Sequence, residues 1–318
     1  MKILCCLLLF FIPLLSHAGN LSCDGSLRWL SLSGVDALRD SGDQTPAFGC
    51  GWQSRITPQK RRLLPALPSF YYRRALPTDM SRSEGFIRYE FWQVSLPLLR
   101  ISDMYLSFDA SSDYRQQMHT LDSALQWQNT SLSSGTELLV DSREHNYRLT
   151  LDLQSSETPV SYLWLNYRRQ QQPLSVSRKT AINQSTANPT ETDLLIEAEI
   201  TSKALGIAFA PSGYGIRPNI SLLLGQGEAR EDGQGGDIAD AVAGELKDSS
   251  DQLSFLLLET QTGLRGRYRL GQHLILQASG GINWRYFLYP DEDSEKTIRK
   301  ASYSAVDYSI SSGLSWRF

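Results

Sequence analysis

The last thirteen residues of the chain, 306–318, alternate strictly between two kinds of side chain. Large and mostly apolar side chains occupy one set of alternate positions: Val306, Tyr308, Ile310, Ser312, Leu314, Trp316 and Phe318. Small or charged side chains occupy the other set: Asp307, Ser309, Ser311, Gly313, Ser315 and Arg317. A period of two predicts a β-strand with one apolar face. Its length exceeds the five or six residues of an average strand and suits the roughly ten that a tilted membrane-spanning strand needs.

The same alternation recurs upstream. Residues 253–270 and 274–288 each place apolar side chains at every second position, and only a short Gly271-Gln272 turn separates the two runs. Such a pair predicts a tight β-hairpin. Shorter stretches at 147–153 and 216–224 follow the same rule. The chain is therefore predicted to be built from long antiparallel strands.

The predicted connections alternate between short and long. Short turns are expected at 211–215 and 271–272, and long polar loops at 170–191, 225–251 and 289–301. Short turns at one end and long loops at the other are typical of transmembrane barrels. Aromatic residues gather near the strand ends, where a membrane meets water, and a closed barrel pairs every backbone group inside lipid. We therefore predict an all-β fold, a transmembrane antiparallel up-and-down β-barrel of about 10–12 strands.

The number of strands depends on how the N-terminal part is interpreted. Ten strands are predicted at 86–95, 99–109, 118–130, 145–154, 158–170, 193–208, 214–228, 253–270, 273–288 and 301–318. Two more are possible at 26–33 and 69–75, which would give twelve. The predicted organisation is thus a barrel over 85–318, preceded by a segment at 19–84 that either supplies the first strands or forms a periplasmic extension.

The first 18 residues have the pattern of a secretory signal peptide. Lys2 precedes 13 apolar residues, Ile3–Leu15, and Ala18 follows at a suitable cleavage point. This apolar run is too short for a membrane helix and has the wrong flanks. A lipoprotein signal is an alternative, because Cys23 follows shortly afterwards. Removal of the signal would change the net charge from -3 to -4.

Two cysteines, Cys23 and Cys50, remain in the mature chain. A lone pair in an oxidising compartment most simply forms one structural disulfide. A zinc site would need about four ligands, and the sequence has neither a Cys-x-x-Cys motif nor clustered histidines. No metal site and no cofactor are predicted.

The final strand resembles the C-terminal strand of gram-negative outer-membrane β-barrels, on Tyr308, Leu314, Trp316 and the terminal Phe318. In that class the barrel-assembly machinery reads such a strand as an assembly signal. The resemblance implies a location in the cell outer membrane, with outer-membrane lipid and the assembly machinery as partners. The size of the chain and the lack of a passenger domain are most similar to solitary autotransporter-type barrels.

The polar face of the predicted strands should line the lumen. These lumen-facing candidates are Glu259, Arg265, Arg267, Arg269, Arg285, Asp307 and Arg317. Glu197, Glu199 and Lys203 of an earlier strand are expected to join them. The charges either pair with one another and stabilise the interior, or form a charged constriction that selects solutes.

An enzyme is the main alternative, since some outer-membrane barrels are hydrolases. Such an enzyme needs a nucleophile, a base and an orienting group close together. His145, with Asp141 and Glu144 nearby, is the best candidate; His119 and His273 are the other histidines of the mature chain. No Gly-x-Ser-x-Gly motif or phosphate-binding loop is present, and we assign no catalytic residue.

Three functions remain open at this point. The first is an outer-membrane barrel with a pore-like or structural role, the second is an outer-membrane hydrolase, and the third is a secreted soluble β-protein that acts as a binding module. The near balance of 31 basic and 34 acidic residues gives no reason to expect a nucleic-acid partner.

Overall fold

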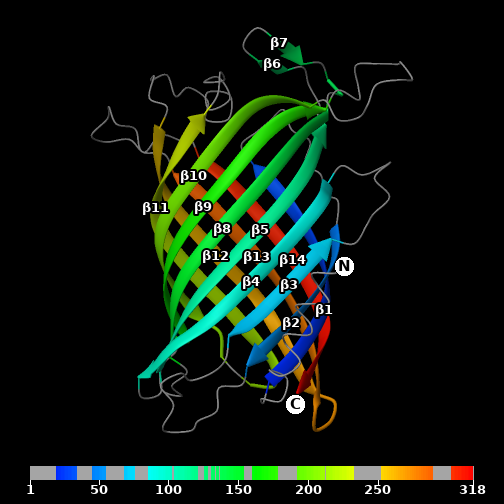
Figure 1. Ribbon diagram of the computed structural model, residues 1–318, viewed down its shortest axis with the longest axis vertical. Coiled ribbons are helices and arrows are strands. Elements are labelled where there is room, and N and C mark those ends of the chain that lie inside the picture. Colours follow the sequence, from blue (N-terminus) through cyan, green and yellow to red (C-terminus); the bar gives the residue numbers. More distant parts are fainter. Residues whose placement is uncertain are drawn as a thin grey trace.

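The chain folds into one closed β-barrel (Figure 1). The computed structural model describes residues 19–33, 45–54, 68–75, 85–101, 104–120, 125–127, 130–132, 134–135, 137–153, 160–177, 192–211, 213–232, 252–288 and 302–317. Twelve strands form the barrel: β1 (Gly19–Ser33), β2 (Thr45–Ser54), β3 (Ser69–Ala75), β4 (Gly85–Ile101), β5 (Met104–Thr120), β8 (Glu137–Asp152), β9 (Tyr162–Ser177), β10 (Thr192–Phe209), β11 (Gly215–Asp232), β12 (Gln252–Arg269), β13 (Leu274–Leu288) and β14 (Ser302–Arg317). Two short strands, β6 (Leu125–Trp127) and β7 (Thr130–Leu132), pair with each other beyond the barrel end (Figure 1).

Every barrel strand pairs antiparallel with its neighbours, and β1 closes the ring against β14. The predicted all-β, up-and-down antiparallel barrel is therefore confirmed, with twelve strands. Among the described residues no helix is long and apolar enough to cross a membrane.

The twelve strands differ in part from those expected. The segment 118–130 does not form a barrel strand, because β5 continues through Thr120 and β6 follows it outside the barrel. The segment 99–109 contains both the end of β4 and the start of β5. β1, β2 and β3 complete the ring, so residues before 85 supply the first strands. No strand is predicted from the sequence where β2 lies, because residues 45–54 contain two glycines and no regular alternation of large apolar side chains.

The two ends of the barrel differ in their connections (Figure 1). Short connections join β4 to β5, β10 to β11 and β12 to β13 at the end where the C-terminus lies, and we call this the turn end. The opposite end, called the loop end, carries the connections that follow β5, β9, β11 and β13, each of 13 residues or more; the 14 residues between β2 and β3 are a long connection at the turn end. The β10–β11 turn needs glycine at two positions, since Gly213 and Gly215 have positive φ angles of 124° and 88°. The short-and-long rhythm predicted for residues 170–301 is therefore present.

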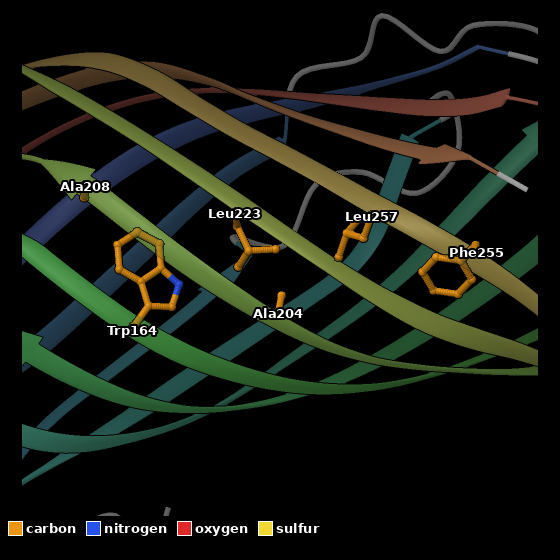
Figure 2. Packing of buried hydrophobic residues seen from close by; sticks show 6 residues of the cluster. All are labelled: Trp164, Ala204, Ala208, Leu223, Phe255 and Leu257. Carbon is orange, nitrogen blue, oxygen red and sulfur yellow. The ribbon is translucent and has the colours of Figure 1, made fainter. Parts of the chain in front are cut away.

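One wall of the lumen is apolar (Figure 2). The buried side chains of Trp164, Ala204, Ala208, Leu223, Phe255 and Leu257 come from the neighbouring strands β9, β10, β11 and β12. Glycines make room for the two large rings. A Cβ atom on Gly206 would lie 2.0 Å from the indole of Trp164, and one on Gly227 would lie 2.4 Å from the ring of Phe255. Substitution of either glycine would force a ring to move, because interiors are closely packed.

The structure contains the predicted Cys23–Cys50 disulfide. The two cysteines are direct partners in the register of β1 and β2. A disulfide-bonded Cys23 has no free thiol for lipid attachment, so the lipoprotein alternative does not fit this structure. The bond therefore links the strand that closes the barrel to its neighbour.

We expect the Cys23→Ser/Cys50→Ser double variant to lose stability. In the chain-entropy model, a crosslink that closes a loop of this size stabilises the folded state by about 3 kcal/mol. Urea unfolding of the refolded protein would measure the loss. Mass spectrometry without reduction should first show the two peptides linked in the parent protein, and alkylation of both thiols in protein taken from the membrane would contradict the prediction.

Candidate functional site

The strands present a consistent apolar outer face. On β10, Leu205 and Ile207 are 60% and 39% exposed, whereas Ala204 and Ala208 on the opposite face are 8% and 7% exposed. The same alternation holds on β11, where Leu222 is exposed and Leu223 is buried. A groove of about 680 Å³ on the outer face is lined by residues of β5 and β8 to β12, most of whose exposed lining is apolar. A surface of this kind is suited to contact with lipid rather than water.

A set of two arginines and two aspartates crosses the lumen between β1, β5 and β14, and we call it the aspartate quartet. Arg28 contacts Asp307, and its Nη1 lies 3.9 Å from Oδ2 of Asp113. Arg115 places Nη2 2.7 Å from Oδ2 of Asp113 and Nη1 3.4 Å from Oδ2 of Asp307. Each arginine therefore contacts both carboxylates. Arg28 also donates a hydrogen bond to the hydroxyl of buried Tyr89 on β4.

A second set, the glutamate quartet, has the same pattern on β8, β9, β12 and β13. Arg168 places Nε 3.1 Å from Oε1 of Glu144 and Nη2 2.8 Å from Oε2 of Glu259. Arg285 places Nη1 2.9 Å from Oε2 of Glu144 and Nε 3.4 Å from Oε2 of Glu259. Again each arginine contacts both carboxylates, and each donates one charge-assisted hydrogen bond, Arg168 from Nη2 to Glu259 and Arg285 from Nη1 to Glu144.

The two quartets form one layer, which we call the charged belt. Asp113 of β5 and Glu144 of β8 are register partners, so the quartets are adjacent. The Arg115–Asp307 pair joins β5 to β14, and the Arg285–Glu144 pair joins β13 to β8. In each case the two strands are separated by four strands on one side of the ring and six on the other. The ion pairs therefore bridge nearly opposite walls of the barrel.

The charged belt is electrically neutral and well shielded. Its four arginines and four carboxylates cancel, and the eight side chains are only 7% to 19% exposed. Charges withdrawn from water to this degree need partners, because desolvation of an unpaired ion costs several kcal/mol. Every charge in the belt has two opposite charges beside it. The arrangement can hold the barrel walls together, and it offers no net charge to attract a solute of either sign.

A smaller polar group lies across β2. Arg73 and the hydroxyl of Tyr71, both on β3, contact the carboxylate of Asp24 on β1. The intervening strand has glycine at the crossing point, and a Cβ atom on Gly49 would lie 2.3 Å from the hydroxyl oxygen of Tyr71. The absence of a side chain at Gly49 is therefore what allows β3 to reach β1.

The lumen-facing candidates from the sequence divide into two groups. Glu259, Arg285 and Asp307 belong to the charged belt. Arg265, Arg267, Arg269 and Arg317 lie further toward the turn end. Sequence analysis missed Arg28, Asp113, Arg115, Glu144 and Arg168 as members of the belt. Asp113 and Arg115 lie between two predicted strands, 99–109 and 118–130. They occupy alternate positions on one face of β5, and this alternation is the sequence signal that could have identified them.

The expectation that Glu199 and Lys203 face the lumen is wrong. Lys203 is exposed on the same face of β10 as Leu205 and Ile207. Glu199 pairs with Arg169, with Arg169 Nε 2.7 Å from Glu199 Oε1, and both side chains are well exposed. The inward face of β10 carries small residues instead, because the apolar wall beside Trp164 leaves no room for long side chains. The side chain of Glu197 lies outside the described residues.

The candidate catalytic cluster around His145 does not assemble. Glu144 points into the lumen and contacts Arg168 and Arg285. His145 is the next residue on β8, so its side chain lies on the opposite face of the strand. His273 stacks on Trp316 at the turn end, and the side chain of His119 lies outside the described residues. Among the described residues there is no group of three or more metal-ligating side chains.

Three of the four residues of the proposed assembly signal, Tyr308, Leu314 and Trp316, lie on β14. Leu314 and Trp316 are half-exposed on the outer face, as the alternation predicts. Phe318, the terminal member of the signal, and the predicted signal peptide at 1–18 lie outside the described residues.

A scan of known protein families finds no model that matches this chain, and a search of curated proteins finds no match. Several solved structures have a similar overall form. The outer membrane protease OmpT from Escherichia coli is 9% identical, with a TM-score of 0.37 over 94% of this chain and 97% of that chain. The β domain of the Bordetella autotransporter BrkA is 10% identical, with a TM-score of 0.34 over 95% and 100%. The translocator domain of the Neisseria meningitidis autotransporter NalP is 12% identical, with a TM-score of 0.36 over 95% and 89%.

At TM-scores below 0.5 these similarities carry no argument about function, and the fold assignment rests on the strand register and on the two faces of the barrel. All twelve strands are antiparallel and close into a ring. The outer face is apolar, and charged side chains cross the lumen. The chain therefore has the architecture of an outer-membrane β-barrel.

Proposed function

We propose that this protein is an integral outer-membrane β-barrel with a structural role, in which the charged belt closes the lumen. The observation that carries the proposal is the set of ion pairs between nearly opposite walls, Arg115–Asp307 and Arg285–Glu144. A diffusion pore needs a continuous water-filled path, and ion pairs that cross the lumen between nearly opposite walls support a closed interior instead. The apolar wall formed by Trp164, Leu223 and Phe255 fills further space in the lumen.

The location follows from the surface of the barrel. Its outer face exposes large apolar side chains on almost every barrel strand, including Leu27, Leu96, Leu165, Ile220, Leu264, Ile282 and Ile310. In water this surface would drive aggregation, whereas in lipid it is satisfied. Export by the signal peptide at 1–18 and contact with outer-membrane lipid complete the proposal.

Heat-modifiable migration tests this location. Protein extracted from outer membranes should migrate differently on a denaturing gel before and after boiling, because a closed barrel resists detergent until it is heated. Identical migration in both samples, together with release from the membrane by carbonate or urea, would favour a secreted protein instead.

Assembly by the barrel-assembly machinery gives a separate prediction at the C-terminus. Deletion of Phe318 removes one aromatic side chain, worth about 2 to 3 kcal/mol if fully buried, which a barrel of twelve strands should tolerate. We therefore expect less protein in the outer membrane and more degradation in the periplasm, with little change in the stability of the barrel that does form. Immunoblots of fractionated cells would measure this, and Phe318→Trp serves as the tolerated control. Unchanged membrane levels after the deletion would contradict the assignment.

A further inference from the structure

The groove on the outer face crosses the border between apolar and polar side chains. Its apolar part is a row of register partners on β8, β9, β10 and β11: Leu149, Leu165, Leu205 and Leu224. The next row toward the loop end also lines the groove and consists of Tyr147, Tyr167, Lys203 and Gln226. The row after that is polar: His145, Arg169, Thr201 and Glu228. All four strands therefore change character within three rows, as is expected where the apolar part of a membrane ends.

Aromatic rings form one side of the groove. The rings of Phe108, Tyr147 and Tyr167 are stacked in a row, with centroid distances of 6.4 Å and 6.2 Å between successive rings. Tyrosine is enriched at the border between membrane and water, because its ring suits lipid and its hydroxyl suits water. The aromatic row therefore places this part of the groove at the border of the loop-end leaflet and gives it a flat apolar side.

Lys203 brings a positive charge into the groove. Its side chain is exposed on the outer face and is flanked in the register by a tyrosine and a glutamine. Among the described residues no carboxylate lies within ion-pair distance of its ammonium group. Glu199 is held by Arg169, and Glu228 lies one row nearer the loop end. The described side chains around Lys203 therefore leave its charge without a direct partner.

The other charged residue of the lining, Arg148, is directed into the lumen. Its guanidinium carbon lies 4.9 Å from the centre of the Trp164 ring. The outer face of the groove thus presents one ammonium group beside leucine and tyrosine side chains. A lysine in such a position extends its charged end toward water or toward an anion. Because this face of the barrel contacts lipid, the headgroup of a lipid is the nearest source of an anion.

We propose that the groove binds one lipid with a negatively charged phosphate headgroup. The acyl chain lies along Leu165, Leu205 and Leu224 beside the aromatic row, and the phosphate pairs with the ammonium group of Lys203. The groove volume of about 680 Å³ is within the range of about 300–1,000 Å³ that is typical of ligand sites. Charge complementarity selects this occupant, since a lipid without net charge leaves Lys203 uncompensated. The inference rests on the proposed outer-membrane location and adds to it a specific lipid site in the loop-end leaflet.

Native mass spectrometry of the refolded barrel in a neutral detergent tests the headgroup. Dioleoylphosphatidylglycerol and dioleoylphosphatidylcholine, titrated separately, have the same chains and differ in net charge. We expect the first bound lipid to show a preference of about fivefold for phosphatidylglycerol, which is the effect of one cation near an anionic lipid. Lys203→Gln should abolish this preference. Arg74→Gln is the matched control and should keep it, because Arg74 is an exposed cation of the outer face that does not line the groove.

A second pair of variants tests the position of the acyl chain. Leu205→Trp places a large ring on the floor of the groove and should weaken the binding of both lipids to a similar degree, with the preference between them retained. Leu264→Trp is its control, because Leu264 is equally exposed on the outer face and lies outside the groove. This variant should bind both lipids as the parent does.

Heat-modifiable migration shows that each variant has folded. Equal affinity of the parent for the two lipids, or an unchanged preference in folded Lys203→Gln, would overturn the proposal. Unchanged binding by folded Leu205→Trp would also overturn it, and a dimer that this substitution abolishes would assign the groove to a second copy of the chain instead. These failures in a heat-modifiable barrel would leave the proposed location and the closed lumen intact, whereas the loss of heat modifiability in the parent would remove the proposed location itself.

Discussion

Replacement of Arg168 by glutamine is expected to lower the free energy of unfolding by about 3 to 5 kcal/mol. The Arg168 side chain is only 7% exposed and contacts both glutamates of its quartet. Without it, Glu144 and Glu259 face each other in a shielded site with Arg285 as their remaining cation. Removal of one partner of a buried ion pair leaves an uncompensated charge, and this penalty is larger than the net contribution of the intact pair.

The adjacent residue supplies the control. Arg169→Gln removes an arginine whose side chain is 47% exposed and whose partner Glu199 is also exposed. An exposed pair contributes about 0 to 1 kcal/mol, so this variant should unfold almost as the parent does. Urea unfolding in lipid vesicles, followed by tryptophan fluorescence, compares the two. If both variants lose the same small amount of stability, the glutamate quartet does not brace the barrel.

The second large effect is expected in conductance. The parent protein in a planar bilayer should show no resolvable single-channel steps, because the charged belt bridges nearly opposite walls. A variant in which Arg28, Asp113, Arg115 and Asp307 are all serine should show discrete openings. The four substitutions leave the net charge unchanged, so a gain in current would come from space and water in the lumen and not from a new surface charge.

An outer-face variant separates this effect from general damage. Arg74 and Glu90 form a pair in which the Arg74 side chain is 63% exposed, with Arg74 Nε 3.7 Å from Glu90 Oε1. The Arg74→Ser/Glu90→Ser variant also removes one charge of each sign and should stay silent. If the parent itself conducts steadily, the lumen is open and the pore-like alternative replaces the closed barrel. If the folded serine variant is silent, the aspartate quartet does not close the lumen.

Together these tests separate the two interpretations that the sequence left open for its lumen-facing charges. Charges that brace the interior should affect stability when one partner is removed, and they should open a path when a whole quartet is removed. Charges that select solutes should affect ion preference in a barrel that already conducts. The pairing of every belt residue with two opposite charges supports the first interpretation.

The sequence by itself determined the fold class and the faces of most strands. Strict alternation assigns each residue of a strand to the lumen or to the outside, so Asp307 and Arg317 were correctly placed opposite Leu314 and Trp316. The Cys23–Cys50 disulfide was also predictable, because an exported chain with two cysteines has one simple pairing. The prediction that Lys203 of β10 faces the lumen was wrong. The lumen-facing positions of β10 belong to the apolar wall, so both faces of this strand carry apolar residues and alternation does not distinguish them.

Only the tertiary structure decided which strands form the ring and which charges meet. Alternation contains no information about which strands pair with each other. The sequence therefore could not reveal that residues 118–130 form no barrel strand or that β2 takes a place in the ring. The belt depends on residues such as Arg28 and Asp307, which are 279 positions apart. Which of them face each other across the lumen depends on ring order and strand tilt. These are properties of the closed barrel as a whole, because a tilted strand brings residues from different register positions to the same height.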